Sequence, residues 1–426
     1  MSTRLPQPPA PPGTARDGSA AFPAAGRSLA GALGILLVAS SLRPAITSVG
    51  PVLDAVGRDN GLDNTTLGLL GTLPLLAFAV VSPLVHGVSR RLGAERVVLL
   101  ALAGLLAGLV VRSLPGAGWL WLGTVAVGTA IAVCNVLVPS IVKRDHASRV
   151  AVMTGTYSAV MSGCAALASG LAVPLAAVLP GGWRTSLAVW ALPTLVAALV
   201  WRRERSCAAP AAQPRLRGAS QLRGASQLRD ARETAVSPSV WRSAVAWQVS
   251  VFMGCQATTF YLLITWLPSM ETDHGVGSGA AGWHLFLLQA AGIAAGLAVP
   301  RVMGRGADQR PAGVVITLPL LVAVTGMMLA PGLAVLWVVL AGVSGGGAMV
   351  VALSLIGLRT RTPAQTAQLS GMAQCVGYLM AAVGPVAAGL LRDAAGSWTP
   401  VYAIMAAIAL AQTVVALYAG RQRYTH

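Results

Sequence analysis

Twelve apolar runs, each long enough to cross a lipid bilayer as a helix, dominate the 426-residue chain. A helix that spans a bilayer needs roughly 20 consecutive apolar residues, so twelve spans with their connections fit this length. Only 10% of the residues are charged, against about 25% in soluble domains. The sequence therefore predicts an all-α membrane protein with twelve transmembrane helices. The runs lie at about 28–56, 65–88, 96–114, 118–142, 150–178, 183–201, 240–268, 279–303, 312–330, 332–358, 366–391 and 397–419.

Basic residues indicate which ends of the spans face the cytoplasm. The net charge of +17 could indicate nucleic acid, but 25 of the 30 basic residues lie before the first run, in alternate connections, or after the last run. This distribution follows the positive-inside rule, and it predicts two cytoplasmic termini and no nucleic-acid partner. Heavy use of Ala, Gly and Arg is typical of a bacterial chain, so we expect a multi-pass protein of the bacterial cytoplasmic (inner) membrane. Four arginines are expected on or near the opposite side: Arg58, Arg112, Arg184 and Arg392.

The chain repeats itself with a shift of about 216 residues. Lys143 matches Arg359, and Pro51 matches Pro268 with a shift of 217. Duplicated halves are typical of alternating-access transporters, whose substrate site lies near the midplane between the halves. In the polar segment between the halves, the hexapeptide RGASQL occurs twice in succession. The expected organisation is a disordered cytoplasmic tail at 1–27, six-helix bundles at 28–201 and 240–420, and a cytoplasmic linker at 202–239.

Four stretches resemble one branch of a known transporter family. They are LRPAITSVGPVL (42–53), NVLVPSIVKRD (135–145), GWRTSLAVWALP (182–193) and WQVSVFMGCQATTFYLLITWLP (247–268). Each is similar to the matching span of the cyanate/nitroimidazole transporter branch of the major facilitator superfamily. The resemblance extends over about 29–419 without the linker, and it implies two pseudo-symmetric six-helix bundles that work by alternating access. It does not fix the substrate, because members of that branch are linked to cyanate, nitroimidazoles and many undetermined compounds.

The loop between the second and third spans departs from the superfamily pattern. That pattern has a gating Asp directly before the first basic residue of this loop, whereas this chain reads VHGVSRRLGAER (85–96), with Ser89 before Arg90. Arg90 and Arg91 remain, and Glu95 could supply the acid one turn away. These three residues are the expected cytoplasmic gate, where the superfamily has a contact between a carboxylate and a helix terminus.

Arg43 is the strongest single candidate for substrate recognition. It lies about fifteen residues into the first span, roughly 22 Å from the cytoplasmic end, and a cation there costs at least about 2.5–3.5 kcal/mol. No Asp or Glu is expected near the middle of any span, and the nearest, Asp54, is three turns away. An anionic or electron-rich substrate would supply the missing counter-charge. Alternatively, Arg43 has a structural role and donates hydrogen bonds to backbone carbonyls that Pro44 and Pro51 leave without a partner. The two prolines also predict that the first span is interrupted and moves during transport.

Neutral polar and aromatic side chains at similar depth complete the predicted site. The repeat places Phe260 opposite Arg43, and an aromatic wall would suit a planar substrate. Alternatively, each of these side chains serves only packing or hydrogen bonding between helices. His284, one turn below the outer end of the eighth span, could carry a coupling proton or simply contact water. The expected substrate-binding residues are Arg43, Asn135, Gln256, Phe260, Tyr261, Gln289, Gln374 and Tyr378.

These features together predict a monomeric secondary transporter, active or facilitative, for a small anionic or polar planar solute. We expect no enzyme, cofactor or metal site, because the chain has no phosphate-binding G-x-x-x-x-G-K-[ST] loop and no hydrolase motif. One alternative is a multidrug or metabolite efflux carrier. A carrier of lipophilic cations would need an acidic residue near the midplane to bind them, and none is expected there. The other is a non-transporting receptor or scaffold, which would not need Arg43. The SGGG run at 344–347 is expected to be a close-packing site.

Overall fold

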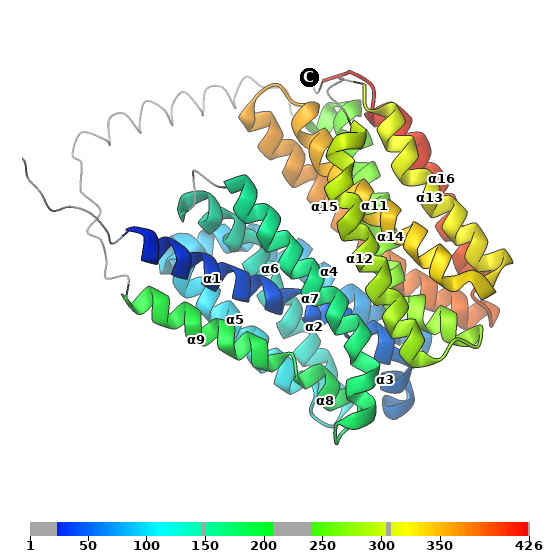
Figure 1. Cartoon of the computed structure of the whole chain (residues 1–426), viewed down its shortest axis with the longest axis horizontal. Helices are drawn as coiled ribbons and strands as arrows, with labels where there is room; N and C mark the ends of the chain where they lie inside the picture. The colour runs from blue at the N-terminus through cyan, green and yellow to red at the C-terminus, as the bar shows by residue number, and fades with distance from the viewer. Residues whose placement is uncertain (1–23, 146–149, 208–239, 304–307, 425–426) are drawn as a thin grey trace, which may run out of the picture.

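The computed structural model describes residues 24–145, 150–207, 240–303 and 308–424. All regular structure in those ranges is helical (Figure 1). Twelve helices or helix groups among the described residues are long and apolar enough to cross a membrane, which confirms the predicted number. The expected tail up to residue 23 and the linker segment 208–239, which contains the RGASQL repeat, lie outside the described residues.

The first half of the chain forms a bundle of six spans. Its first span is divided into α1 (Ala24–Leu42), α2 (Pro44–Thr47), the 3₁₀ turn η1 (Gly50–Val52) and α3 (Leu53–Asn60). The others are α4 (Asn64–Leu92), α5 (Ala94–Arg112), α6 (Ala117–Asp145), α7 (Val150–Val178), and the pair α8 (Trp183–Ala188) and α9 (Ala191–Cys207). Fully buried Ile35, Leu102, Ile131 and Trp201 belong to the core that joins them.

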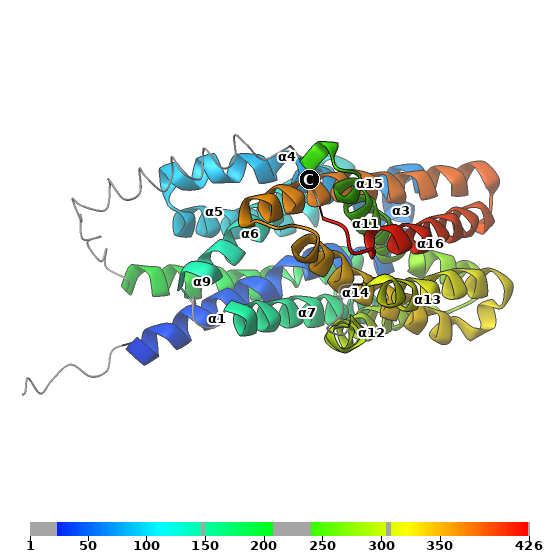
Figure 2. The same cartoon turned by 90° about the horizontal axis from the view of Figure 1, so that it is seen from above.

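The second half forms a similar bundle, which lies beside the first in two perpendicular views (Figures 1 and 2). After the 3₁₀ turn η3 (Val240–Arg242), its spans are α11 (Ala244–Asp273), α12 (Ser278–Met303), α13 (Arg310–Leu329), α14 (Ala334–Leu358) with the preceding turn η4 (Pro331–Leu333), α15 (Pro363–Ala395) and α16 (Thr399–Ala419). Large apolar side chains such as Val80, Val322 and Val383 stay exposed on the outer faces. In a bilayer these faces contact lipid, because lipid tails accept apolar surface at no cost.

Local sequence explains where the helices begin, end and break. Asp63 caps α4 by accepting a hydrogen bond from the Thr66 backbone N–H at 2.9 Å, and α15 ends at Gly396, whose φ of +66° favours glycine. In the first span the helix stops at Leu42 and restarts at Pro44, leaving Arg43 in a turn. Proline has no N–H to donate to the preceding helical turn. The predicted interruption of the first span is therefore present.

The two bundles contact each other from the middle of the helices to the ends predicted to be extracellular. The Thr72 hydroxyl of α4 donates a hydrogen bond to the Ala382 carbonyl of α15 at 2.8 Å. Nearby, a Cβ added to Gly68 would lie 2.5 Å from the Pro385 carbonyl oxygen, so the two backbones touch. These contacts close one end of the interface and leave a cavity toward the other end.

Candidate functional site

A cavity of about 400 Å³ lies between the two bundles. This volume is within the roughly 300–1,000 Å³ that is usual for small-molecule sites. Its lining comes from the first span, α7, α11, α12, α13, α14, α15 and α16. It extends from the depth of Arg43 toward Gly155 and Leu353, which lie near the predicted cytoplasmic ends of α7 and α14. A small organic solute therefore has room in the middle of the molecule.

Arg43 lines this cavity from the break in the first span. Its guanidinium carbon lies 5.6 Å from the centroid of the Phe260 ring, which is within the range of a cation–π contact. Within the described ranges, no carboxylate pairs with Arg43. The repeat-based pairing of Arg43 with Phe260 thus corresponds to a real contact across the two bundles.

Aromatic rings form one wall of the cavity next to Arg43. Phe260 and Tyr261 stand edge to face with their centroids 5.4 Å apart, and both line the cavity with Tyr378. Tyr378 also packs against Phe78 of α4, with the centroids 5.7 Å apart. Three of the predicted residues are therefore brought together around the guanidinium. A planar ring placed there would lie against these aromatic side chains and near the positive charge of Arg43.

Two of the predicted glutamines lie in the cavity wall and hold the helices together. Gln256 donates a hydrogen bond from Nε2 to the Gly345 carbonyl at 3.1 Å. Gln289 donates from Nε2 to the Ser169 hydroxyl of the first bundle at 2.9 Å, while its Oε1 has no partner among the described residues. Gln289 thus joins the two bundles and still offers an acceptor to the cavity.

The structure does not bring Asn135 and Gln374 into this cavity. Asn135 is half-buried in α6 and is absent from the lining. Gln374 is exposed on α15 and donates from Nε2 to the Ser370 hydroxyl at 3.1 Å. Gln374 lies one helical turn before Tyr378 on the same face of α15, beyond the residues that line the cavity.

Two polar residues that the sequence did not single out do line the cavity. Ser344 of α14 and Gln412 of α16 are 0% and 1% exposed. The Ser344 hydroxyl and both amide atoms of Gln412 have no hydrogen-bond partner within the described ranges. Ser344 belongs to the glycine run, whose Gly342 and Gly346 do pack on the α12 backbone. Gln412 is an isolated amide in an apolar run, as Asn135 is. The same sequence feature that singled out Asn135 could therefore have predicted Gln412 as a site residue.

His284 is paired with an acid that sequence reasoning overlooked. Its Nδ1 lies 2.9 Å from Oε2 of Glu271, which is only 7% exposed. The predicted seventh span ends at 268, but α11 continues to Asp273 and carries Glu271 into the packed region. His284 is therefore not the sole titratable group there. Glu271 lies near the outer end of α11, away from the level of Arg43.

The predicted cytoplasmic gate residues lie at the end of the molecule away from the closed contacts. Arg90 and Arg91 are exposed at the end of α4. Glu95 forms an ion pair with Arg144, with Oε1 and NH2 2.6 Å apart, and both residues belong to the first bundle. At the opposite end, Pro51 is buried in η1.

Two apolar-shelled helical bundles around a central cavity with a few polar groups are typical of membrane transporters of the alternating-access class. The chain belongs to the Major Facilitator Superfamily, which residues 35–385 match. It is 39% identical to the 2-nitroimidazole transporter of Escherichia coli (strain K12), over 92% of this chain and 95% of that relative. It is 26% identical to the cyanate transport protein CynX of the same strain, over 90% of this chain and 95% of that relative.

Solved structures agree with this fold. The structure of a D-xylose–proton symporter superposes with a TM-score of 0.71 over 93% of this chain and 97% of that one, at 13% sequence identity. The resemblance to the cyanate/nitroimidazole branch, predicted from four stretches, is confirmed. The protein is thus a multi-pass membrane protein of a family of small-molecule transporters.

Proposed function

We propose that this protein carries a small, planar, anionic or electron-rich solute across the bacterial cytoplasmic membrane by alternating access. The observation that carries the proposal is Arg43, a cation that pairs with no carboxylate of the described residues and lies at the wall of the central cavity, against the Phe260 ring. A guanidinium left in an apolar membrane interior is costly, so a bound anion is a natural counter-charge. Its planar fork also suits the two oxygens of a carboxylate or nitro group.

The relatives support this substrate class. The printed names of two of them refer to 2-nitroimidazole and to cyanate. One is a nitro-substituted aromatic ring and the other is a small anion, and both present electron-rich atoms that a guanidinium can bind. The aromatic wall of Phe260, Tyr261 and Tyr378 would favour the ring compound through stacking.

The shape of the cavity supports an inward-facing state. With the termini on the cytoplasmic side, the bundles are closed at the outer end by Thr72 and Ala382, and the cavity extends toward the inner ends of α7 and α14. Such a state binds or releases the solute at the cytoplasm. Rocking of the bundles about the Arg43 level would open the outer end.

Efflux of a lipophilic cation is the less favoured function. The cavity lining contains Arg43 but no Asp or Glu among the residues that the structure describes. A cationic drug would meet a like charge there and no counter-charge. A neutral polar metabolite remains the second candidate, because Ser344, Gln412 and Gln289 offer unpaired hydrogen-bonding atoms.

Uptake by the purified protein in liposomes tests the proposal. Radiolabelled cyanate, 2-nitroimidazole, benzoate and a lipophilic cation would be offered to proteoliposomes and to protein-free liposomes. We expect saturable, protein-dependent uptake or exchange of at least one of the anionic or nitro compounds. Uptake of the cation alone would contradict the proposal, and movement of no compound by a folded protein would favour a receptor or scaffold.

A further inference from the structure

A second arginine is buried in the first bundle without a full set of partners. Arg112 is the last residue of α5 and is 2% exposed. Its NH1 donates a hydrogen bond to the Ala45 carbonyl of α2 at 2.7 Å. Its Nε and NH2 have no hydrogen-bond partner, and no carboxylate of the described ranges forms an ion pair with it. The sequence instead placed Arg112 on or near the outer side of the membrane.

The packing around Arg112 keeps its head group inside the protein. Gly123 of α6 lies directly against the Arg112 backbone, where any side chain would collide. A buried guanidinium stays charged, so its charge needs compensation. The Ala45 carbonyl and the negative end of α5 supply only partial charges. One positive charge therefore remains in an apolar region.

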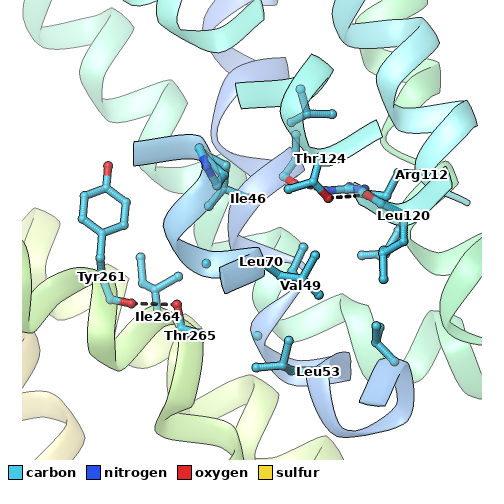
Figure 3. Close-up of a pocket in the computed structure, with 17 residues that line it drawn as sticks. Ile46, Val49, Leu53, Leu70, Arg112, Leu120, Thr124, Tyr261, Ile264 and Thr265 are labelled. Atoms are coloured by element: carbon cyan, nitrogen blue, oxygen red, sulfur yellow. Dashed lines mark hydrogen bonds between the residues drawn. The ribbon is translucent and has the colours of Figure 1, made fainter. Parts of the chain in front are cut away.

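A separate small cavity adjoins this guanidinium. It has a volume of about 30 Å³ and is lined by Arg112, Thr124 and otherwise mostly apolar side chains (Figure 3). Figure 3 shows Arg112 and Thr124 on one side and Val49 and Leu53 of the first span on another. A cavity needs roughly 10–15 Å³ of such space to hold one water molecule. This one holds a water or a monatomic anion, but not a substrate that needs the central cavity of about 400 Å³.

We propose that this pocket binds a monatomic anion such as chloride, held by Nε and NH2 of Arg112. The anion supplies the missing negative charge and satisfies donors that otherwise stay unpaired. The Thr124 hydroxyl already donates to the Leu120 carbonyl at 2.7 Å, so Arg112 is the principal donor. A bound anion would also hold Arg112 in place to donate its hydrogen bond to the Ala45 carbonyl. Because Ala45 is two residues from Arg43, this contact stabilises the interrupted part of the first span.

Thermal unfolding of the purified full chain tests the site without any transport assay. Chloride or bromide would be titrated against gluconate at constant ionic strength. We expect the halide to raise the Tm by a few degrees in a saturable manner, because a ligand that binds only the folded state stabilises it. Arg112→Gln should abolish the halide dependence. Arg58→Gln is the matched control, since it removes an exposed cation of α3 that lines neither cavity and should keep the dependence.

A bromide-soaked crystal of the wild-type protein provides a second readout that needs no variant. Anomalous scattering should place a bromide ion within hydrogen-bond distance of Arg112. If no peak occurs there and the Tm does not respond to halide, a water molecule fills the pocket and the proposal is wrong. An equal halide response in Arg112→Gln would also overturn it. If Arg112→Gln does not fold, Arg112→Lys should retain a charge and bind halide more weakly. Because neither readout involves transport, the solute proposal can fail while this one holds.

Discussion

Gln412 is a buried amide of α16 that belongs to the lining of the central cavity. Both of its amide atoms lack partners among the described residues, and an unpaired buried polar group costs about 1–3 kcal/mol. Such a cost is tolerated at a site that a ligand later satisfies. The same reasoning applies to the Ser344 hydroxyl, so these residues extend the predicted site to α14 and α16.

Gln412→Leu should therefore separate stability from binding. We expect the variant to unfold at the same or a higher temperature, because two unpaired polar atoms are removed. Substrate binding should weaken by about 3- to 10-fold, the loss of one neutral hydrogen bond. Gln374→Leu, which changes an exposed amide outside the cavity, should leave binding unchanged. Unaltered binding in Gln412→Leu would show that the solute does not reach this residue.

Glu271 and His284 act as a unit if protons modulate transport. Their 2.9 Å contact joins α11 to α12 near the outer end, where Tyr402 of α16 and Asp273 are the neighbouring titratable groups. An imidazole ordinarily titrates near pH 6.5. We expect Glu271→Gln and His284→Gln to remove the same part of the pH dependence of transport between about pH 5 and 8.

His274→Gln is the control for this pair. The Nδ1 atom of the His274 ring contacts the Met270 carbonyl oxygen at 2.7 Å. His274 directly follows α11, the helix that carries Glu271. This variant should keep the wild-type pH profile. If Glu271→Gln and His284→Gln also keep it, the pair is structural and protons do not act through it.

At the scale of whole helices, the outer ends of the two bundles are joined by the Asp393 carboxylate of α15, which binds the N-terminus of α4. Asp393 of α15 accepts hydrogen bonds at 2.7 Å from the Thr65 backbone N–H, the Thr65 hydroxyl and the Asn64 amide of α4. The N-terminus of a helix carries a partial positive charge that favours this arrangement. The superfamily pattern predicts such a contact at the cytoplasmic end, where this chain has Ser89. Here it occurs at the outer end.

Asp393→Ala should shift the protein toward states with an open outer end. Because the carboxylate is exposed, the contact contributes about 1 kcal/mol, or roughly a fivefold change in population. Spin labels at residues 58 and 395, on a background without native cysteines, would measure the distance between the bundles by electron resonance. The long-distance population should increase in the variant.

Asp59→Ala is the matched control for this measurement. The Asp59 carboxylate accepts from the Trp183 indole N–H at 3.2 Å and pairs with Arg184 inside the first bundle. Its loss should not change the distance between bundles. Equal distance distributions in Asp393→Ala and the wild type would mean that the outer contact does not set the conformation.

At the scale of the whole molecule, the sequence predicts the spans well and the site only in part. The spans could be predicted because a bilayer requires long apolar runs and sorts Arg and Lys to one side. The depth of Arg43, Gln256 and Phe260 followed from their position in these runs. The pairing of Arg43 with Phe260 followed from the internal repeat.

The direction in which a side chain faces could not be predicted in the same way. A helix that is apolar on all sides has no amphipathic stripe to mark its inner face, so Asn135 and Gln374 were grouped with residues that line the cavity although neither lines it. Glu271 was missed because α11 extends past the last strongly apolar residue. Arg112 was expected on or near the outer side of the membrane, but its burial could not be predicted, because it depends on how closely Gly123 of α6 packs against it.

Binding of the solute to Arg43 variants tests the central claim most directly. The affinity of the purified protein for the compound that it transports would be measured by calorimetry for the wild type, Arg43→Gln and Arg43→Lys. We expect Arg43→Gln to remain folded and to bind about 30-fold more weakly or worse, since a charged hydrogen bond of about 2 kcal/mol is lost. Arg43→Lys should recover only part of the affinity, because an ammonium keeps the charge without the planar fork. Wild-type affinity in Arg43→Gln would make Arg43 a structural support of the broken first span and contradict the account.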